Sequence, residues 1–348
     1  MASIFNYIEK YGDKTFKEKE FNELDNIVFS FLAYLDFTET DINKIENPTL
    51  ELIGKQYLKK FKLRQISKYG FSEKDAYKLL ERVYYKKRYK DVVLDDYIYN
   101  INNMQFSAIT FKISNNLIYI AFEGTDHLMM GWKESISLMS TFPVLAQYEA
   151  INYANKHVKL FGPRVIIGGH SKGGNLALVS SMYLNRLKKL KVIKVYSNDG
   201  PGLRKKQFIS YKYKSIKRKY IHIVPTNSMI GILLRNDKYK VVKTHSLSFF
   251  SHTMSSWRVS DDHLLEGELT KKHQRLESKI IDWLDMHDDN DRKLMINTVF
   301  NVLEKCNIND TMTLIKFKNI IKIIKELKNV DEQTKDLTID FLKNTFFS

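Results

Sequence analysis

The sequence predicts an α/β fold with a mostly parallel central sheet, preceded by a helical segment and followed by a helical extension. Three observations carry this prediction. Strand-like and helix-like patterns alternate between residues 106 and 242. Helical periodicity dominates residues 1–100 and returns after about residue 265. At residues 166–175, a serine flanked by glycines stands in a tight turn between a strand-like and a helix-like stretch.

The first 100 residues are expected to be mainly helical. Apolar side chains recur at helical spacing between Phe21 and Leu32, and Ser72 is a suitable N-cap for a helix that ends near Tyr85. Residues 38–62 are polar and mixed. Such a segment could cover an active site as a cap or pack as an ordinary outer layer, and the sequence leaves both open.

A β-hairpin is expected to open the sheet, because two strand-like stretches, 106–113 and 117–123, are separated by the turn signal Ser-Asn-Asn. The elements expected next are a helix at 144–158, a strand at 164–167, a helix at 175–187, and strands at 192–196, 220–224 and 239–242. This alternation is typical of parallel strands joined by helices. We expect residues 1–265 to form this domain and residues 266–348 to form the helical extension.

The stretch IIGGHSKGGN at 166–175 predicts a nucleophile elbow with Ser171 at its apex. Gly169 and Gly173 would let the strand and the helix approach where a Cβ would clash, and Ser171 should adopt a strained backbone conformation. The amide N–H of Lys172 would stand at the start of the helix, where the helix dipole favours a developing oxyanion. Such an elbow predicts an α/β-hydrolase fold.

An activated serine needs a histidine to take its proton and a carboxylate to orient that histidine. In α/β-hydrolases the acid and then the histidine follow the serine in the chain. Asp199 is the first carboxylate after the elbow, and it ends the next expected strand, where catalytic groups of such sheets gather. The same residue could simply open a tight turn.

Two histidines, His245 and His252, follow the last expected strand of the sheet and could reach back to the serine. His252 is favoured over His245, because residues 257–259 could anchor its loop. His222 lies inside an expected strand, which favours a structural role. His170 adjoins the serine, but adjacent side chains on a strand diverge, so it is not expected to be the base.

The second oxyanion donor should come from a loop after an early strand. The amide of Thr125 or Asp126 is suitably placed for it, with the Thr125 hydroxyl as a further donor. We also expect Asp126 and His170 to contact the substrate, although Asp126 could serve only as a turn or cap residue.

The net charge is +16, and a run at 204–220 holds eight Lys or Arg, no acid and three Tyr. This run could contact an anionic membrane or nucleic acid, but a solvated helix or loop between two strands is favoured. Nucleic acid is the partner that we expect least. A single cysteine excludes an internal disulfide, and no signal peptide or long apolar stretch is evident. The expected location is cytoplasmic.

Several motifs carry a family resemblance. AFEGTD at 121–126 resembles the A-F-R-G-T-D stretch of class 3 (fungal-type) lipases, with Glu123 in place of Arg. GGHSKGGNLA at 168–177 is more similar to a bacterial family of lipase-like α/β-hydrolases labelled Mbeg-like. The resemblance spans about residues 1–265. Its other motifs are F-N-E-x-D-N at 21–26, G-W-K-E at 131–134, D-G-P-G at 199–202, and a His before Trp-x-Val at 252–259.

The resemblance implies a serine hydrolase that cleaves an ester of acyl or lipid type, with Ser171, Asp199 and His252 as the catalytic triad. A hydrolase of this kind requires no metal or organic cofactor. Many class 3 lipases carry the acid after the following strand, but the comparable stretch here, 221–225, has no acid, which favours Asp199. The resemblance does not supply the natural substrate.

The sequence leaves two other hypotheses about function open. The chain could be a catalytically silent α/β-hydrolase scaffold, although such a scaffold has no physical reason to keep a strained elbow. It could also be a basic protein that binds an anionic membrane or nucleic acid through residues 204–220.

Overall fold

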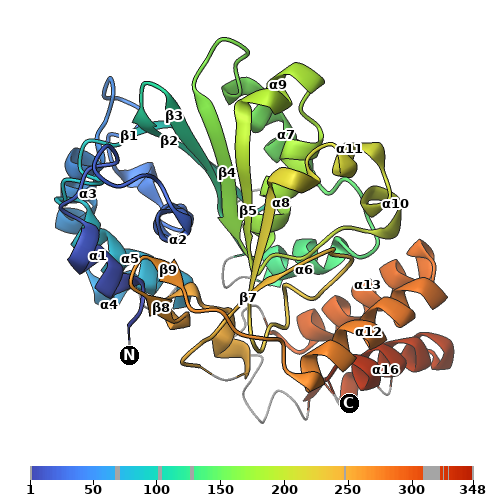
Figure 1. The fold of residues 1–348 in the computed structure, drawn as a ribbon. Helices are drawn as coiled ribbons and strands as arrows, with labels where there is room; N and C mark the ends of the chain where they lie inside the picture. The colour runs from blue at the N-terminus through green and yellow to red at the C-terminus, as the bar shows by residue number, and fades with distance from the viewer. Residues whose placement is uncertain are drawn as a thin grey trace.

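A seven-stranded sheet forms the centre of the protein (Figure 1), with strand order β1 to β7 following the chain. The computed structural model describes residues 2–66, 71–100, 104–125, 129–246, 248–308, 322–323, 325–327 and 329–346. The strands are β1 (Val93–Asn100), β2 (Phe106–Ser114), β3 (Leu117–Phe122), β4 (Arg164–His170), β5 (Val192–Asn198), β6 (Tyr220–Pro225) and β7 (Lys240–Val242). Strands β1 to β3 pair antiparallel and β3 to β7 parallel, so the predicted mostly parallel α/β sheet is confirmed.

Helices lie before, between and after the strands. The N-terminal helices are α1 (Ile4–Tyr11), α2 (Glu23–Leu32), α3 (Leu50–Lys60), α4 (Leu63–Ile66) and α5 (Phe71–Val83). Those between strands are α6 (Met129–Ser137), α7 (Leu145–His157), α8 (Lys172–Met182), α9 (Arg186–Lys191), α10 (Lys205–Phe208) and α11 (Tyr211–Lys214), followed by the 3₁₀ turn η2 (Lys217–Lys219). The C-terminal helices are α12 (Lys271–Met286), α13 (Asp289–Lys305) and α16 (Glu332–Phe346).

Two N-terminal elements were not predicted. Helix α3 lies inside the stretch described above as polar and mixed. Strand β1 ends the segment that was expected to be helical, so that expectation is wrong at residues 93–100. Its pattern was hidden because Asp95 and Asp96 interrupt the apolar alternation. Asp96 has a φ of 48°, and the pairing register with β2 shifts between Asp95 and Ile98.

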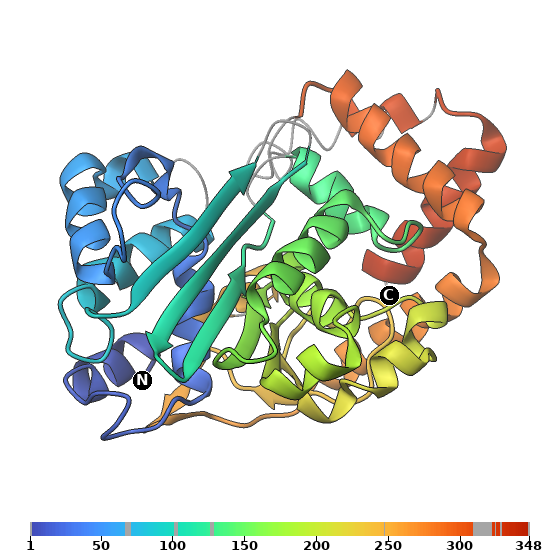
Figure 2. The same ribbon diagram turned by 90° about the horizontal axis from the view of Figure 1, so that it is seen from above.

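The two faces of the sheet are covered by different parts of the chain. Each parallel strand pairs with the next one in sequence, so right-handed crossovers place the connecting helices on one face. There α7 and α8 pack against side chains such as Ile120 and Ile167. The opposite face buries Phe111, Tyr119 and Ile166 under the N-terminal helices (Figure 2). The N-terminal segment therefore forms a layer that covers the second face of the sheet, and it is not a separate cap.

A buried ion pair holds the N-terminal layer together. Arg88 and Asp25 are both fully buried, with Arg88 Nη2 2.6 Å and Nε 2.8 Å from the two carboxylate oxygens. The Tyr89 hydroxyl donates to the same carboxylate, and the guanidinium also donates to the carbonyls of Lys19 and Glu20. Asp25 lies in the first turn of α2, so this network fixes the helix that packs on the sheet.

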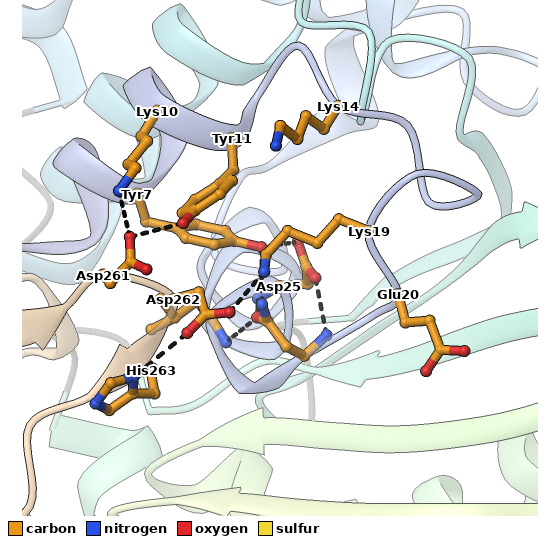
Figure 3. Close-up of polar contacts among 12 residues, drawn as sticks. Tyr7, Lys10, Tyr11, Lys14, Lys19, Glu20, Asp25, Asp261, Asp262 and His263 are labelled. Atoms are coloured by element: carbon orange, nitrogen blue, oxygen red, sulfur yellow. Dashed lines mark hydrogen bonds and ion pairs between the residues drawn. The ribbon is translucent and has the colours of Figure 1, made fainter.

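The first helix is also joined to a hairpin far along the chain, β8 (Val259–Ser260) and β9 (His263–Leu264). Figure 3 shows Lys10 and Tyr11 reaching Asp261, at 2.5 and 2.6 Å, and Lys19 reaching Asp262 at 2.6 Å. The segment just before this hairpin contains His252. The N-terminal layer therefore anchors the hairpin that follows the loop of His252.

The C-terminal helices form their own apolar cluster around Trp283, Phe300 and Phe341. The cluster continues into Leu138 and Ile232, so these helices pack against the sheet domain. None of the helices in the described ranges is both long and apolar enough to span a bilayer.

Replacing Arg88 with Met should lower the free energy of unfolding by about 3–5 kcal/mol, because it leaves the Asp25 carboxylate buried without its counter-ion. Urea unfolding followed by circular dichroism measures this. The control is Lys55→Met, which breaks an exposed ion pair with Glu51 and should change the free energy of unfolding far less, because water screens exposed charges. Equal losses in the two variants would contradict the assigned importance of the buried pair.

Candidate active site

The predicted strand, turn and helix meet at Ser171. Strand β4 ends at His170 and helix α8 begins at Lys172. Ser171 is nine-tenths buried. Its backbone has φ 57° and ψ −129°, a conformation that residues other than glycine rarely adopt. Two backbone hydrogen bonds hold it there: the Ser171 N–H donates to the Asn198 carbonyl, and the Gly174 N–H donates to the Ser171 carbonyl, both at 2.9 Å.

The two glycines beside Ser171 are required by close backbone approach. A Cβ on Gly173 would lie 2.2 Å from the Phe122 carbonyl oxygen, and a Cβ on Gly169 would lie 2.5 Å from the backbone of Gly173. Such distances are well inside van der Waals contact. The glycines therefore let the end of β3, the elbow and the start of α8 touch.

The N-terminal layer reaches the elbow through Asn198, the last residue of β5. Its side chain accepts a hydrogen bond from Asn26 (2.9 Å) and donates one to Ser30 (3.0 Å), and both partners lie on α2. All three side chains are fully buried. Because the Asn198 carbonyl takes the Ser171 N–H, helix α2 helps to fix the backbone of the elbow.

Asp199 and His252 are brought together at the same end of the sheet. The Asp199 carboxylate is fully buried, and its Oδ2 lies 2.7 Å from His252 Nδ1. Its Oδ1 accepts hydrogen bonds from the Ser228 hydroxyl (2.5 Å) and the Gly231 N–H (3.0 Å). The other candidate, His245, is exposed, and its Nε2 lies 3.4 Å from the carbonyl of Ala2. The structure therefore pairs Asp199 with His252, whereas His245 lies beside Ala2.

The loop that carries His252 is fixed by its neighbours. It forms the 3₁₀ turns η3 (Ser248–His252) and η4 (Met254–Ser256). Trp257 is buried, as expected for an anchor, and its Nε1–H donates to the Ser251 carbonyl at 2.9 Å. The Ser251 hydroxyl donates to the Asn227 carbonyl, next to Ser228. The histidine loop and the loop that holds Asp199 are thus tied to each other.

His170 is buried behind the Asp199–His252 pair and does not face solvent. Its Nε2 donates to the His252 carbonyl (2.8 Å), so its Nδ1 accepts from the Tyr34 hydroxyl (2.7 Å). The rings of His170 and His252 are 4.4 Å apart, which places His252 next to the elbow. Burial, reinforced by His252, holds the pKa of His170 well below its ordinary value, so the ring is neutral. His170 is expected from the sequence to contact substrate, but both of its ring nitrogens are engaged inside the protein.

Lys172 directly follows Ser171, and Thr125 follows Gly124, where a Cβ would lie 2.6 Å from the His170 carbonyl oxygen. Lys172 opens α8, whose first amides have no partner within the helix. Thr125 follows β3, and its Oγ1 is 2.5 Å from the Ser135 hydroxyl on α6. The Ser135 hydroxyl donates its single hydrogen to the Gly131 carbonyl, so the Thr125 hydroxyl donates to Ser135. Asp126 lies outside the described residues.

The Lys172 side chain makes a buried link that sequence reasoning missed. Its Nζ donates to the Gln105 carbonyl (2.6 Å) and side-chain oxygen (3.0 Å), and pairs with Glu134 Oε2 (3.0 Å). Gln105 Nε2 in turn donates to the Gly124 carbonyl (3.0 Å). We call Lys172, Gln105 and Glu134 the lysine brace. It joins the elbow to the loop that begins at Gly124.

The signal for the brace was present in the sequence, since Glu134 belongs to the G-W-K-E motif and Lys172 follows the serine. What the motifs did not supply was the pairing between them. Tyr34, which holds His170, and Ser228 and Gly231, which hold Asp199, carried no signal of their own in the sequence.

A family model described as Mbeg1-like matches residues 83–301, more than half of the chain. No curated protein matches the sequence. Among solved structures, the chain is similar to a crystal structure of M37 lipase, with 15% sequence identity, coverage of 61% of this chain and 70% of that chain, and a TM-score of 0.36.

A buried histidine near this site makes stability depend on pH. Burial lowers the pKa of His222 from 6.5 to about 4, with the Asp199 charge acting in the opposite direction. The unfolded chain therefore takes up a proton near pH 6.5 that the folded protein takes up only near pH 4. The free energy of unfolding should fall as the pH drops through this window, by roughly 2 kcal/mol between pH 6.5 and 5.

Urea unfolding at pH 7 and pH 5 tests this. In the variant His222→Phe the loss between the two pH values should be smaller by that amount. The control His263→Phe removes an exposed histidine and should keep the wild-type pH dependence. An unchanged loss in His222→Phe would show that other groups cause it.

Proposed function

This chain belongs to the Mbeg1-like family, and from that premise we propose that it is a serine hydrolase that cleaves a carboxylic ester of acyl or lipid type. One observation carries the proposal. A carboxylate and an imidazole lie 2.7 Å apart beside a serine held in a strained turn, in the chain order Ser171, Asp199, His252. Strain of this kind persists where the surrounding structure enforces it, as it does at reactive sites.

In the proposed mechanism, Ser171 Oγ attacks the acyl carbonyl while His252 accepts the hydroxyl proton. His252 then returns that proton to the leaving alcohol, which leaves an acyl-enzyme. A water molecule attacks the acyl carbon with His252 again as base, and Ser171 recovers its proton as the acid departs. Asp199 fixes the imidazole through its Nδ1, and the bonds from Ser228 and Gly231 keep the carboxylate aligned.

The oxyanion would be bound by two backbone amides. One is the N–H of Lys172 at the start of α8, aided by the helix dipole. The other is the N–H of Thr125, because the hydroxyl of Thr125 already donates to Ser135. The lysine brace connects the two donors, since it joins the side chain of Lys172 to the carbonyl of Gly124.

The first test is reaction with a fluorophosphonate probe, which labels an activated serine. The wild-type protein should be labelled and Ser171→Ala should not, with unchanged circular dichroism in the variant. A panel of p-nitrophenyl esters of increasing acyl length would then report the substrate class. Equal labelling of both proteins, or full turnover by Ser171→Ala, would overturn the proposal. A folded wild type that does not react would favour the silent scaffold.

In the same assay Asp199→Asn reports on the acid. It should lower kcat by about 10⁴-fold, because an asparagine does not hold the imidazole in the required tautomer. A fall of less than about tenfold would point to a different acid.

The lysine brace should affect catalysis without touching substrate. Lys172→Met keeps the amide N–H but removes the bonds to Gln105 and Glu134. We expect kcat to fall by about 10- to 100-fold with little change in KM, because the two oxyanion donors lose their alignment. Glu134→Gln, which keeps an acceptor for Lys172, should retain more activity.

The matched control is Lys133→Met, which removes an exposed neighbouring lysine and should stay within about twofold of the wild type. The free energy of unfolding is measured alongside. A Lys172→Met protein that is less stable but has the wild-type kcat would assign the brace a structural role only.

A further inference from the structure

The positive charge of the protein is concentrated in three segments. Residues 156–164, 186–194 and 204–220 hold three, five and eight Lys or Arg and no Asp or Glu. This total equals the whole net charge of +16, so the rest of the chain carries equal numbers of acidic and basic side chains. Such concentration is not expected from a general lysine-rich composition.

Residues 204–209 follow the end of β5, where Arg204 and Lys205 pair with Asp289 and Asp285. The other residues of the three segments lie together at one edge of the sheet. They lead into β4, β5 and β6, which are parallel neighbours, so all three stand where these strands begin. Hydrogen bonds join them: Lys219 Nζ donates to the carbonyls of Lys189 and Val192, and Lys189 Nζ donates to the Ser215 hydroxyl. In Figure 1, α9 and the start of β4 lie at the upper end of the sheet, and the strands point away from them. We call residues 156–164, 186–194 and 211–220 the basic edge.

Few of these cations are neutralised. Within the described part of the chain, carboxylates from elsewhere pair with two of the thirteen Lys and Arg of the basic edge, Lys156 with Asp96 and Lys217 with Asp237. Burial and the neighbouring charge of Lys212 lower the pKa of Lys189, which shows like charges crowded together. The basic edge is therefore a surface with a strong positive potential.

Large apolar side chains are exposed among the cations. Phe161 is 98% exposed and Leu190 69%. Leu160, Leu187 and Tyr211 are exposed in the same segments. Exposed apolar groups that gather on one surface mark an interaction site. Most of these are aliphatic, which suits insertion between lipids, whereas single-stranded nucleic acids are bound by stacking on aromatic rings.

We propose that the basic edge docks on an anionic phospholipid bilayer, with Lys and Arg contacting the headgroups and Phe161 and Leu190 entering the interface. Charge complementarity and apolar insertion act together in peripheral binding of this kind. The inference is independent of the proposed hydrolase activity, because none of these residues belongs to the candidate active site.

The docked orientation follows from the strand direction. Ser171, Asp199 and His252 lie after the ends of parallel strands, and the basic edge lies before their starts. Strand β4 has seven residues, so about 20 Å separates the two edges. A molecule docked in this way would hold the candidate active site away from the bilayer, open to a substrate that arrives from the solution side.

Flotation with lipid vesicles tests the proposal. The protein should bind vesicles that contain phosphatidylglycerol but not vesicles of phosphatidylcholine alone, and high salt should release it. The triple variant Arg186→Gln, Lys214→Gln, Arg218→Gln should bind on the order of 100-fold more weakly. The control Lys271→Gln, Lys272→Gln, Lys279→Gln removes three exposed charges from α12 and should bind as the wild type does.

The apolar contribution and the orientation are tested by fluorescence. Phe161→Trp should be quenched by brominated phosphatidylglycerol, and Met286→Trp, on the exposed end of α12, should not. Phe161→Ser with Leu190→Ser should weaken vesicle binding while leaving the unfolding midpoint unchanged. Equal quenching at both positions, equal binding by the two triple variants, or tighter binding to single-stranded RNA than to the vesicles would overturn the proposal.

Discussion

The hydrogen bond from the Ser171 amide to the Asn198 carbonyl is the interaction on which the candidate site depends. It holds a serine at positive φ, and it comes from the residue just before Asp199. Asn198 is fixed in turn by Asn26 and Ser30 on α2. Leaving a buried polar group without a partner is costly, so a shift in any of these residues would displace the backbone of the elbow.

The order of the sheet explains why the first ninety residues are needed. Strands that pair in chain order send all their connecting helices to one face. The opposite face would expose Phe111, Tyr119 and Ile166 if α1 to α5 were absent. The N-terminal segment therefore completes the core. Its contacts with the β8–β9 hairpin extend this dependence to the loop of His252.

The two ends of the parallel strands have separate characters. At their carboxyl ends, acids, histidines and backbone amides are brought together in a buried, hydrogen-bonded arrangement. At their starts, cations and apolar side chains face solvent and few are paired. A parallel sheet keeps these properties apart, because every strand has its start at one edge and its end at the other.

Local signals in the sequence determined the strands β2 to β7, the elbow at Ser171, and the candidates Asp199 and His252. Short-range patterns decide those features, namely apolar periodicity, turn residues and glycine spacing. Only the tertiary structure showed that His252, and not His245, pairs with Asp199, and that both ring nitrogens of His170 are engaged inside the protein. It also paired Lys172 with Glu134 and made the N-terminal helices a layer of the core. Those outcomes depend on contacts between residues far apart in the chain, and no local pattern encodes such contacts.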